Sequence, residues 1–148
     1  MPLTLRIHSE PLSLCQLAPD ASVPADIIAH PMTGFFRTHD EVTLWCPTSL
    51  APKNAKTESG FIALEFIGPF EFALTGILTQ IANPLAAAGV SIVPLSSFST
   101  DYILIKADQQ QAAIEAIQKA GHTLIGATES QPLVIPAKAG IQQRASAR

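Results

Sequence analysis

The order of extended and helical patterns between residues 61 and 127 is the feature that most constrains the fold. Residues 61–67 are an apolar run in which Ile62, Leu64 and Phe66 alternate with Ala63 and Glu65, which predicts a strand with one buried face. From about residue 73, leucines and isoleucines recur at spacings of three and four, as on one face of a helix. Gly89 is a typical helix stop.

The rest of this stretch continues with two more strands, a second helix and a last strand. The patterns place them at residues 90–97, 101–107, 108–120 and 122–127. The resulting order, strand–helix–strand–strand–helix–strand, is the split arrangement of a ferredoxin-like domain. We therefore expect an α+β fold in which four antiparallel strands carry two helices on one face.

Three segments of this stretch resemble ACT domains, and more narrowly the bacterial proteins related to the CASTOR arginine sensors. They begin Gly68-Pro-Phe-Glu-Phe, Asn83-Pro-Leu-Ala and Leu95-Ser-Ser-Phe-Ser. The resemblance covers residues 41–122, and its most specific part is the run Ser99-Thr-Asp-Tyr-Ile-Leu. ACT domains are small regulatory modules that bind amino acids, usually at an interface between two copies. The resemblance implies a βαββαβ ACT domain in a non-enzymatic, amino-acid-binding regulatory protein.

The N-terminal half has weaker patterns. Residues 3–17 predict two strands broken at Pro11, and residues 25–29 predict a short helix. Two further strands are expected at residues 35–38 and 41–46. The element order and the resemblance together suggest a degenerate ACT-like half that packs against the second half, although the residues show no repeat.

These patterns divide the chain into four parts. We expect an N-terminal half over residues 1–50, a polar, proline-bearing linker over 51–60, the ACT domain over 61–131, and a tail over 132–148. The tail has no sustained period and ends in small, polar and basic residues, so it is predicted to be disordered. No function is assigned to it.

Composition argues against several classes of partner. The 148-residue chain has a net charge of -3 and no basic cluster, which argues against nucleic acid. No apolar run approaches the ~20 residues that span a membrane, and no signal-peptide pattern opens the chain, so we expect a cytoplasmic protein. Cys15 and Cys46 are then expected to be reduced core thiols, the alternative being a disulfide, which is rare in the cytosol.

A low content of charged residues points to self-association. Only 14% of the residues are charged, and a sheet with helices on one face leaves its other face open. Phe61, Ala63 and Ile67 would lie on that face. We therefore expect a homodimer.

The first candidate site is the predicted helix start around Glu71, Thr75, Gly76 and Ile77. Unpaired amides and a partial positive charge at a helix N-terminus suit a carboxylate ligand. The structural alternative is that Thr75 caps the helix and Gly76 permits close helix–sheet packing. From the residues alone that alternative is the simpler one, but ACT ligands sit at this position, so the resemblance favours a binding site.

The second candidate is the polar corner between two predicted strands. Ser97, Thr100 and Asp101 lie in a run of hydroxyl residues within an otherwise apolar segment. Asp101 could accept charge-assisted hydrogen bonds from an ammonium or guanidinium group. The alternative is an ordinary turn whose side chains satisfy the local backbone. With the resemblance, Asp101 is the strongest single candidate for a ligand contact.

The third candidate is the predicted hairpin around residues 38–44. The cluster His39-Asp40-Glu41 could indicate a metal site or a small enzyme, but adjacent residues in a hairpin point in different directions and rarely converge on one ion. A solvated turn is the simpler interpretation. The resemblance implies another role, because the edge of a first module can close over the second module's site through backbone groups near Thr43 and Leu44.

Three functions therefore remain open. The favoured one is amino-acid binding between two ACT-like modules, and the others are a ligand-free interaction module and, less favoured, a small enzyme. The sequence has no nucleophile elbow, phosphate-binding loop or zinc spacing, so no catalytic residue, cofactor or metal is predicted. The residues do not identify the amino acid: Glu71 and Asp101 could hold a guanidinium group, and a small aliphatic ligand is equally compatible.

Overall fold

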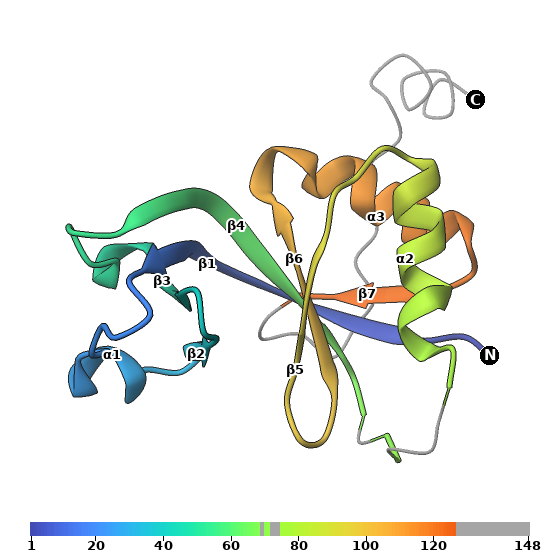
Figure 1. The fold of residues 1–148 in the computed structure, drawn as a ribbon. Helices are drawn as coiled ribbons and strands as arrows, with labels where there is room; N and C mark the ends of the chain where they lie inside the picture. The colour runs from blue at the N-terminus through green and yellow to red at the C-terminus, as the bar shows by residue number, and fades with distance from the viewer. Residues whose placement is uncertain (69, 72–74, 127–148) are drawn as a thin grey trace, which may run out of the picture.

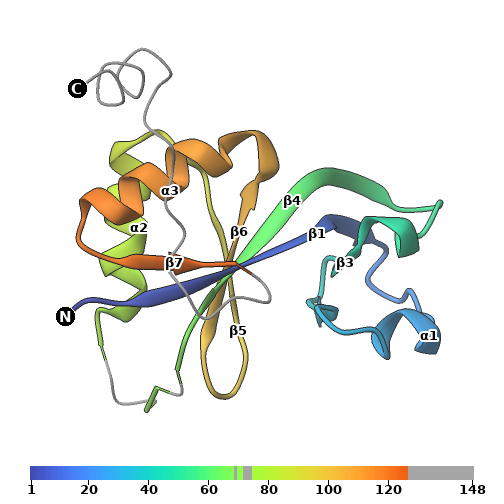
Figure 2. The ribbon, with the colours of Figure 1, turned by 180° about the vertical axis from the view of Figure 1, so that it is seen from behind.

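The computed structural model describes residues 1–68, 70–71 and 75–126. Over these residues the chain forms one seven-stranded sheet, with α2 and α3 on one face (Figures 1 and 2). Two 3₁₀ turns, Thr48–Leu50 and Ala107–Gln109, accompany the regular elements. In chain order these are β1 (Thr4–Leu17), α1 (Ala25–Ile28), β2 (Gly34–Arg37), β3 (Val42–Pro47), β4 (Lys56–Phe66), α2 (Ile77–Ala87), β5 (Val93–Ser96), β6 (Asp101–Lys106), α3 (Gln110–Lys119) and β7 (Thr123–Ile125).

Two long strands, β1 and β4, run through the whole molecule and join two lobes (Figure 1). The strand order is β2-β3-β1-β4-β6-β5, with β7 also beside β1. The first part of β1, Thr4–Arg6, pairs with β7, whereas Leu12–Leu17 pairs with β3. We call α2, α3, β5, β6, β7 and the adjoining parts of β1 and β4 the ACT lobe, after the family that this part of the sequence resembles. The N-terminal lobe comprises α1, β2, β3 and the remaining parts of β1 and β4.

The predicted βαββαβ order is confirmed in β4, α2, β5, β6, α3 and β7. The sequence predicted four antiparallel strands for this unit, but its sheet has a fifth strand, because β1 lies between β4 and β7. It is antiparallel to β4 and parallel to β7. The insertion is anchored at its start, where the Leu3 amide donates to Nδ1 of His122 (3.1 Å) and the Thr123 amide donates to the Leu3 carbonyl (2.9 Å).

The prediction that Pro11 breaks the N-terminal segment into two strands is wrong. β1 continues through Pro11, and the pairing with β4 shifts register between His8 and Leu12 and again between Leu12 and Leu14. Proline is tolerated at such an irregularity because the residue there needs no amide donor for the ladder. Pro11 itself is exposed.

The boundary between the halves also differs from the expectation. β4 begins at Lys56, so the second half of the segment predicted as a linker is strand. The strand reaches back far enough for Lys56 and Thr57 to pair with Gln16 and Cys15 of β1. The two lobes therefore share strands instead of packing as separate sheets. The tail predicted over residues 132–148 lies outside the described residues.

Helix α2 begins at Ile77, four residues later than predicted, and residues 72–74 lie outside the described part of the chain. Ile77, Ile81 and Leu85 form its buried face, at the spacings that predicted the helix. The helix ends at Ala87, and Gly89 follows with a φ of +73°, a conformation that glycine adopts without strain.

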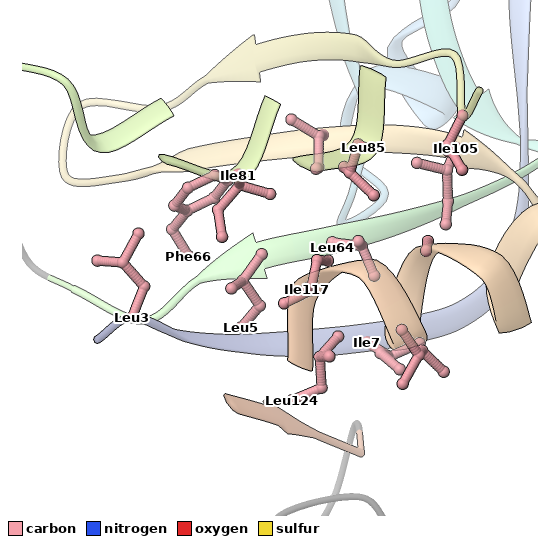
Figure 3. Close-up of a cluster of buried hydrophobic side chains, with 14 of the residues drawn as sticks. Leu3, Leu5, Ile7, Leu64, Phe66, Ile81, Leu85, Ile105, Ile117 and Leu124 are labelled. Atoms are coloured by element: carbon pink, nitrogen blue, oxygen red, sulfur yellow. The ribbon is translucent and has the colours of Figure 1, made fainter. Parts of the chain in front are cut away.

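The main core lies between the sheet and the two helices of the ACT lobe (Figure 3). Leu5, Leu64 and Phe66 project from the strands toward Ile81 of α2 and Ile117 of α3, and all five side chains are fully buried. A smaller cluster holds the N-terminal lobe together and includes Val42, Leu44, Cys15 and Cys46. The two cysteines are free and buried in it, as predicted.

A third apolar cluster lies on the sheet apart from the main core. Leu12, Phe61, Ala63 and Leu104 are buried there, and Met32 of the N-terminal lobe packs against them. The expectation that Phe61 and Ala63 present an open apolar face to a second copy is therefore wrong, because the chain covers these residues itself. None of the helices in the described residues is long and apolar enough to cross a membrane.

Candidate functional site

A small polar pocket opens where the β5–β6 hairpin, the segment after β4 and the start of α2 meet. Its volume is about 180 Å³. Five residues predicted as ligand contacts line it, namely Glu71, Ile77, Ser97, Thr100 and Asp101. Phe70, Ser96, Phe98 and Ser99 complete the lining. The two segments that the sequence predicted as a helix-start site and a polar corner thus form one pocket.

The hairpin that forms one wall is held by its own hydroxyl groups. The Ser97 side chain donates to the Thr100 carbonyl (3.0 Å) and accepts from the Thr100 amide (3.2 Å). The Thr100 hydroxyl donates to the Phe66 carbonyl (2.6 Å), which fixes the tip of the hairpin against the end of β4. Ser97 and Thr100 therefore form an ordinary turn whose side chains satisfy the local backbone, which was the alternative to a binding site. Both residues nevertheless line the pocket.

Backbone contact joins the other wall to the hairpin. The Phe70 amide donates to the Ser99 carbonyl at 3.0 Å. Because this bond connects the segment after β4 with the hairpin tip, it places Glu71 on the same pocket as Asp101. Phe70 and Phe98 add apolar surface at the two sides, and Phe98 is 83% exposed.

Asp101 is the most suitable group for binding a cation. Its carboxylate is half-buried and accepts a short hydrogen bond from the Ser96 hydroxyl (2.6 Å). Among the described residues, no lysine, arginine or histidine forms an ion pair with Asp101 or with Glu71. Two carboxylates without a basic partner thus lie on one small pocket, and they favour a ligand that carries an ammonium or guanidinium group.

The start of α2 supplies donors to the same pocket. Gly76 is the N-cap with a φ of +78°, and no side chain caps the helix. The first intrahelical bond of the described backbone comes from the Gln80 amide to the Gly76 carbonyl (3.2 Å). Within the described residues the amides before Gln80 have no acceptor, and such amides suit a carboxylate. Ile77, the first helical residue, lines the pocket.

Two structural alternatives for this helix start are wrong. Thr75 does not cap the helix, since it is exposed and its side chain makes no cap hydrogen bond. Gly76 does not serve close packing against the described residues either, because among them a Cβ there would meet only the Thr79 hydroxyl, at 3.7 Å. Glycine fits this position because of the positive φ.

The third candidate segment does not belong to this pocket. Leu44 is fully buried in the small N-terminal cluster, and Thr43 pairs with Phe36 of β2 and Gln16 of β1. Its hydroxyl donates to Glu41 (3.1 Å). The N-terminal lobe thus brings neither Thr43 nor Leu44 to the residues around Asp101.

The cluster His39-Asp40-Glu41 forms a solvated turn. The Thr38 hydroxyl accepts from the amides of Asp40 (3.2 Å) and Glu41 (3.1 Å), which is a local turn motif. Across the described part of the chain, no three His, Cys, Asp or Glu side chains are placed to hold a metal ion. This geometry agrees with the turn interpretation of the sequence.

Some lining residues were not singled out from the sequence. Phe70 and Phe98 each sit beside a polar residue in a segment without periodicity, so nothing in their spacing marks them. Ser96 and Ser99 belong to the hydroxyl-rich run that predicted the polar corner, and that run was the available signal. The contact between the two segments comes from tertiary structure, through the Phe70–Ser99 hydrogen bond.

The fold and a family model together indicate which known proteins this chain is similar to. A βαββαβ unit with helices on one face places the chain in the ferredoxin-like class of α+β domains. More particularly, residues 56–119 match the model of the ACT domain family. Over this stretch the chain is similar to ACT domains and has the fold that its residues predicted.

One curated relative is a eukaryotic sensor. Over 51 residues the chain is 41% identical to the human cytosolic arginine sensor for mTORC1 subunit 1. The match covers 34% of this chain but only 16% of that protein, so the chain spans a small part of the relative's length.

Solved structures share the fold of nearly the whole chain. Protein Atu0741 from Agobacterium tumefaciens superposes with a TM-score of 0.79 at 24% identity, covering 91% of this chain and 99% of that one. The ligand-free regulatory subunit of aspartate kinase from Thermus thermophilus gives a TM-score of 0.55 at 11% identity, covering 78% and 95%. At these identities the likeness concerns the fold, and it includes the N-terminal lobe.

Proposed function

We propose that this protein is a non-enzymatic regulatory protein that binds an amino acid in the pocket between Asp101 and the start of α2. One observation carries the proposal: two carboxylates and a helix start line the same pocket, and the described residues supply neither a basic partner nor a side-chain cap for them. An amino acid has both complementary charges. Its ammonium group fits Asp101 and Glu71, and its carboxylate fits the helix amides.

The proposal agrees with the names of two similar proteins, which describe a sensor and a regulatory subunit. A matched stretch of the human relative belongs to a protein named as an arginine sensor, and the Thermus structure is a regulatory subunit. Neither name identifies the amino acid for this chain. Aspartate and glutamate would bring a further negative charge to Glu71 and Asp101, so we expect a neutral or basic amino acid.

A second copy of the chain is the expected cover for the pocket. The described residues that line it all lie between Phe70 and Asp101, and none of them belongs to the N-terminal lobe. Phe98 at its rim is 83% exposed, and an apolar side chain beside a polar pocket suits an interface. We therefore propose that the protein is a cytoplasmic homodimer. Its ligand would lie between two copies of the chain and not between the two halves of one chain.

A thermal-shift screen against the common amino acids tests the function. A ligand that binds only the folded state raises the free energy of unfolding by about 2.7 kcal/mol at a hundredfold excess over its dissociation constant. We expect one or a few neutral or basic amino acids to raise the melting temperature. If none does, the ligand-free interaction module becomes the better account. Light scattering on the same sample tests the dimer, which a mass near 15.7 kDa would contradict.

A further inference from the structure

A second pocket lies at the junction of the two lobes. Met32, Thr33 and Trp45 of the N-terminal lobe form one side, and Leu95, Ser96 and Tyr102 of the ACT lobe contribute the other. Its volume is about 260 Å³, larger than that of the pocket around Asp101. Ser96 and Ser97 line both pockets, so the tip of the β5–β6 hairpin separates them.

The Trp45 ring is held in place by a glycine on the neighbouring strand. Gly34 of β2 stands directly opposite Trp45 of β3 in the antiparallel register. A Cβ on Gly34 would lie only 2.3 Å from Cζ2 of the indole and 2.7 Å from Cε2, so the ring covers the bare backbone there. Trp45 is half-buried and reaches the pocket. This wall is therefore a large aromatic surface with a fixed position.

Met32 on the same wall has an unusual backbone. Its φ is +59°, and among the described residues it is the one non-glycine residue with a positive φ. A side chain in this conformation usually costs free energy, and such residues are enriched at binding sites. The conformation directs the chain so that Met32 packs on the third apolar cluster and lines the pocket beside Trp45.

The unpaired charge nearest to this pocket, among the described residues, is the carboxylate of Asp101. The Ser96 hydroxyl that lines it donates to Asp101, which has no basic partner among the described residues. Tyr102, the opposite aromatic residue, lies near Glu65. The Glu65 carboxylate is already paired with Arg6 (3.4 Å) and His8 (2.7 Å), so Glu65 adds no unpaired charge there. Burial, and then the Glu65 charge, raise the pKa of the Tyr102 phenol, so the hydroxyl stays protonated at neutral pH. No lysine, arginine or histidine is among the described residues that line the pocket. A negatively charged ligand is therefore disfavoured.

We propose that this second pocket binds a small aromatic amine. Its ring would stack on Trp45 and pack against Met32 and Leu95, since offset aromatic pairs and thioether–aromatic contacts are both favourable. Its ammonium group would point to the hydroxyl wall of Ser96, behind which Asp101 lies. Apolar aromatic surface and the Asp101 carboxylate behind Ser96 occur together here, and an aromatic amine matches both.

The protein contains its own reporter for this pocket. Trp45 is the single tryptophan of the chain, so indole emission reports on one wall of the proposed site. Phenethylamine is the probe, and hydrocinnamate is its matched control, with the same ring but a carboxylate in place of the amine. We expect a saturable change of Trp45 emission with phenethylamine, and affinity for hydrocinnamate weaker by about tenfold or more.

A pair of variants separates this pocket from the one around Asp101. Met32→Gly removes one wall while keeping a backbone that glycine adopts freely, so it should weaken phenethylamine binding by about tenfold without unfolding the protein. Phe98→Ala, on the other side of the hairpin, should leave the affinity unchanged. Far-ultraviolet circular dichroism checks the fold of each variant.

Three results would overturn the proposal: no saturable change in the wild-type protein, equal affinity for phenethylamine and hydrocinnamate, or unchanged affinity in a folded Met32→Gly variant. The wild-type comparison of the two probes stands even if that variant does not fold. None of these outcomes depends on the amino-acid screen, because that screen concerns a different pocket.

Discussion

The two lobes are made from the same two long strands but differ in how much they bury. In the ACT lobe, two helices of ten or more residues cover the sheet, and sixteen of the described residues form its main core. The N-terminal lobe has a four-residue helix and a buried cluster of six described residues. A core that small supplies little hydrophobic free energy. We infer that the N-terminal lobe is stable because β1 and β4 extend into it from the larger lobe.

Removing the largest fully buried side chain of the ACT lobe tests that dependence with the greatest expected effect. Phe66 is 0% exposed at the centre of the main core. Phe66→Ala should lower the free energy of unfolding by about 3–5 kcal/mol through lost burial and a cavity. Urea unfolding should be followed by circular dichroism, which reports the helices, and by Trp45 emission, which reports the other lobe. Both midpoints should fall together; a Trp45 transition that stays at its wild-type midpoint would show independent lobes.

The reciprocal change lies in the smaller core. Leu44 is also 0% exposed, and Leu44→Ala should cost about 2–3 kcal/mol, near the lower end for such substitutions, because a small exposed lobe can relax around the cavity. The same two probes should again move together, since β1 carries the change into the ACT lobe. Loss of the Trp45 transition alone, with the helical signal unchanged, would mean that the N-terminal lobe unfolds by itself.

A smaller effect is expected from crowding the indole ring. Gly34→Ala places a methyl group within 2.3 Å of Cζ2 of Trp45, so the ring must move, at a cost of about 1–3 kcal/mol. Trp45 emission should shift toward that of an exposed indole. Trp45→Leu should remove most of the cost of Gly34→Ala in a double-mutant cycle. Additive effects of the two changes would show that the cost comes from the backbone of β2 instead.

The smallest effect should appear only at alkaline pH. Burial, and secondarily Cys15, raise the pKa of the Cys46 thiol from 9.0 to about 11. The unfolded chain therefore loses this proton at a lower pH than the folded protein does. The resulting stabilisation is complete below pH 9 and is lost as the pH rises through 11. Cys46→Ala should lose less stability than the wild type between pH 8.5 and pH 11, measured by urea unfolding; equal losses would contradict the assignment.

The fold of the ACT lobe was predictable because its patterns are local. Ile77, Ile81 and Leu85 recur at helical spacing, and Gly89 and Gly121 follow the helices with the positive φ that their positions suggested. The insertion of β1 between β4 and β7 was not predictable, since strand neighbours far apart in sequence leave no local pattern. The strand break predicted at Pro11 was wrong for a related reason. Only the register shifts between β1 and β4 show that a proline is tolerated there.

The candidate site was predictable in parts. The hydroxyl-rich run before Asp101 and the helix start at Gly76 were visible in the sequence, and the structure places that run and Ile77, the residue after Gly76, on one pocket. The resemblance to ACT domains suggested their use, and it also suggested Thr43 and Leu44, which the structure places in the other lobe. The pocket between Trp45 and Tyr102 had no sequence signal, because its walls come from two lobes.

The central claim is that an amino acid binds in the ACT lobe and not between the lobes of one chain. Calorimetric titration with the amino acid found in the screen tests it most directly, on the wild type, Asp101→Ala and Thr43→Ala. Losing a charge-assisted hydrogen bond usually costs about 1.5–3 kcal/mol, so Asp101→Ala should weaken binding by about tenfold or more. Thr43→Ala should bind like the wild type. Unchanged affinity in a folded Asp101→Ala variant, or an equal loss in Thr43→Ala, would contradict the account.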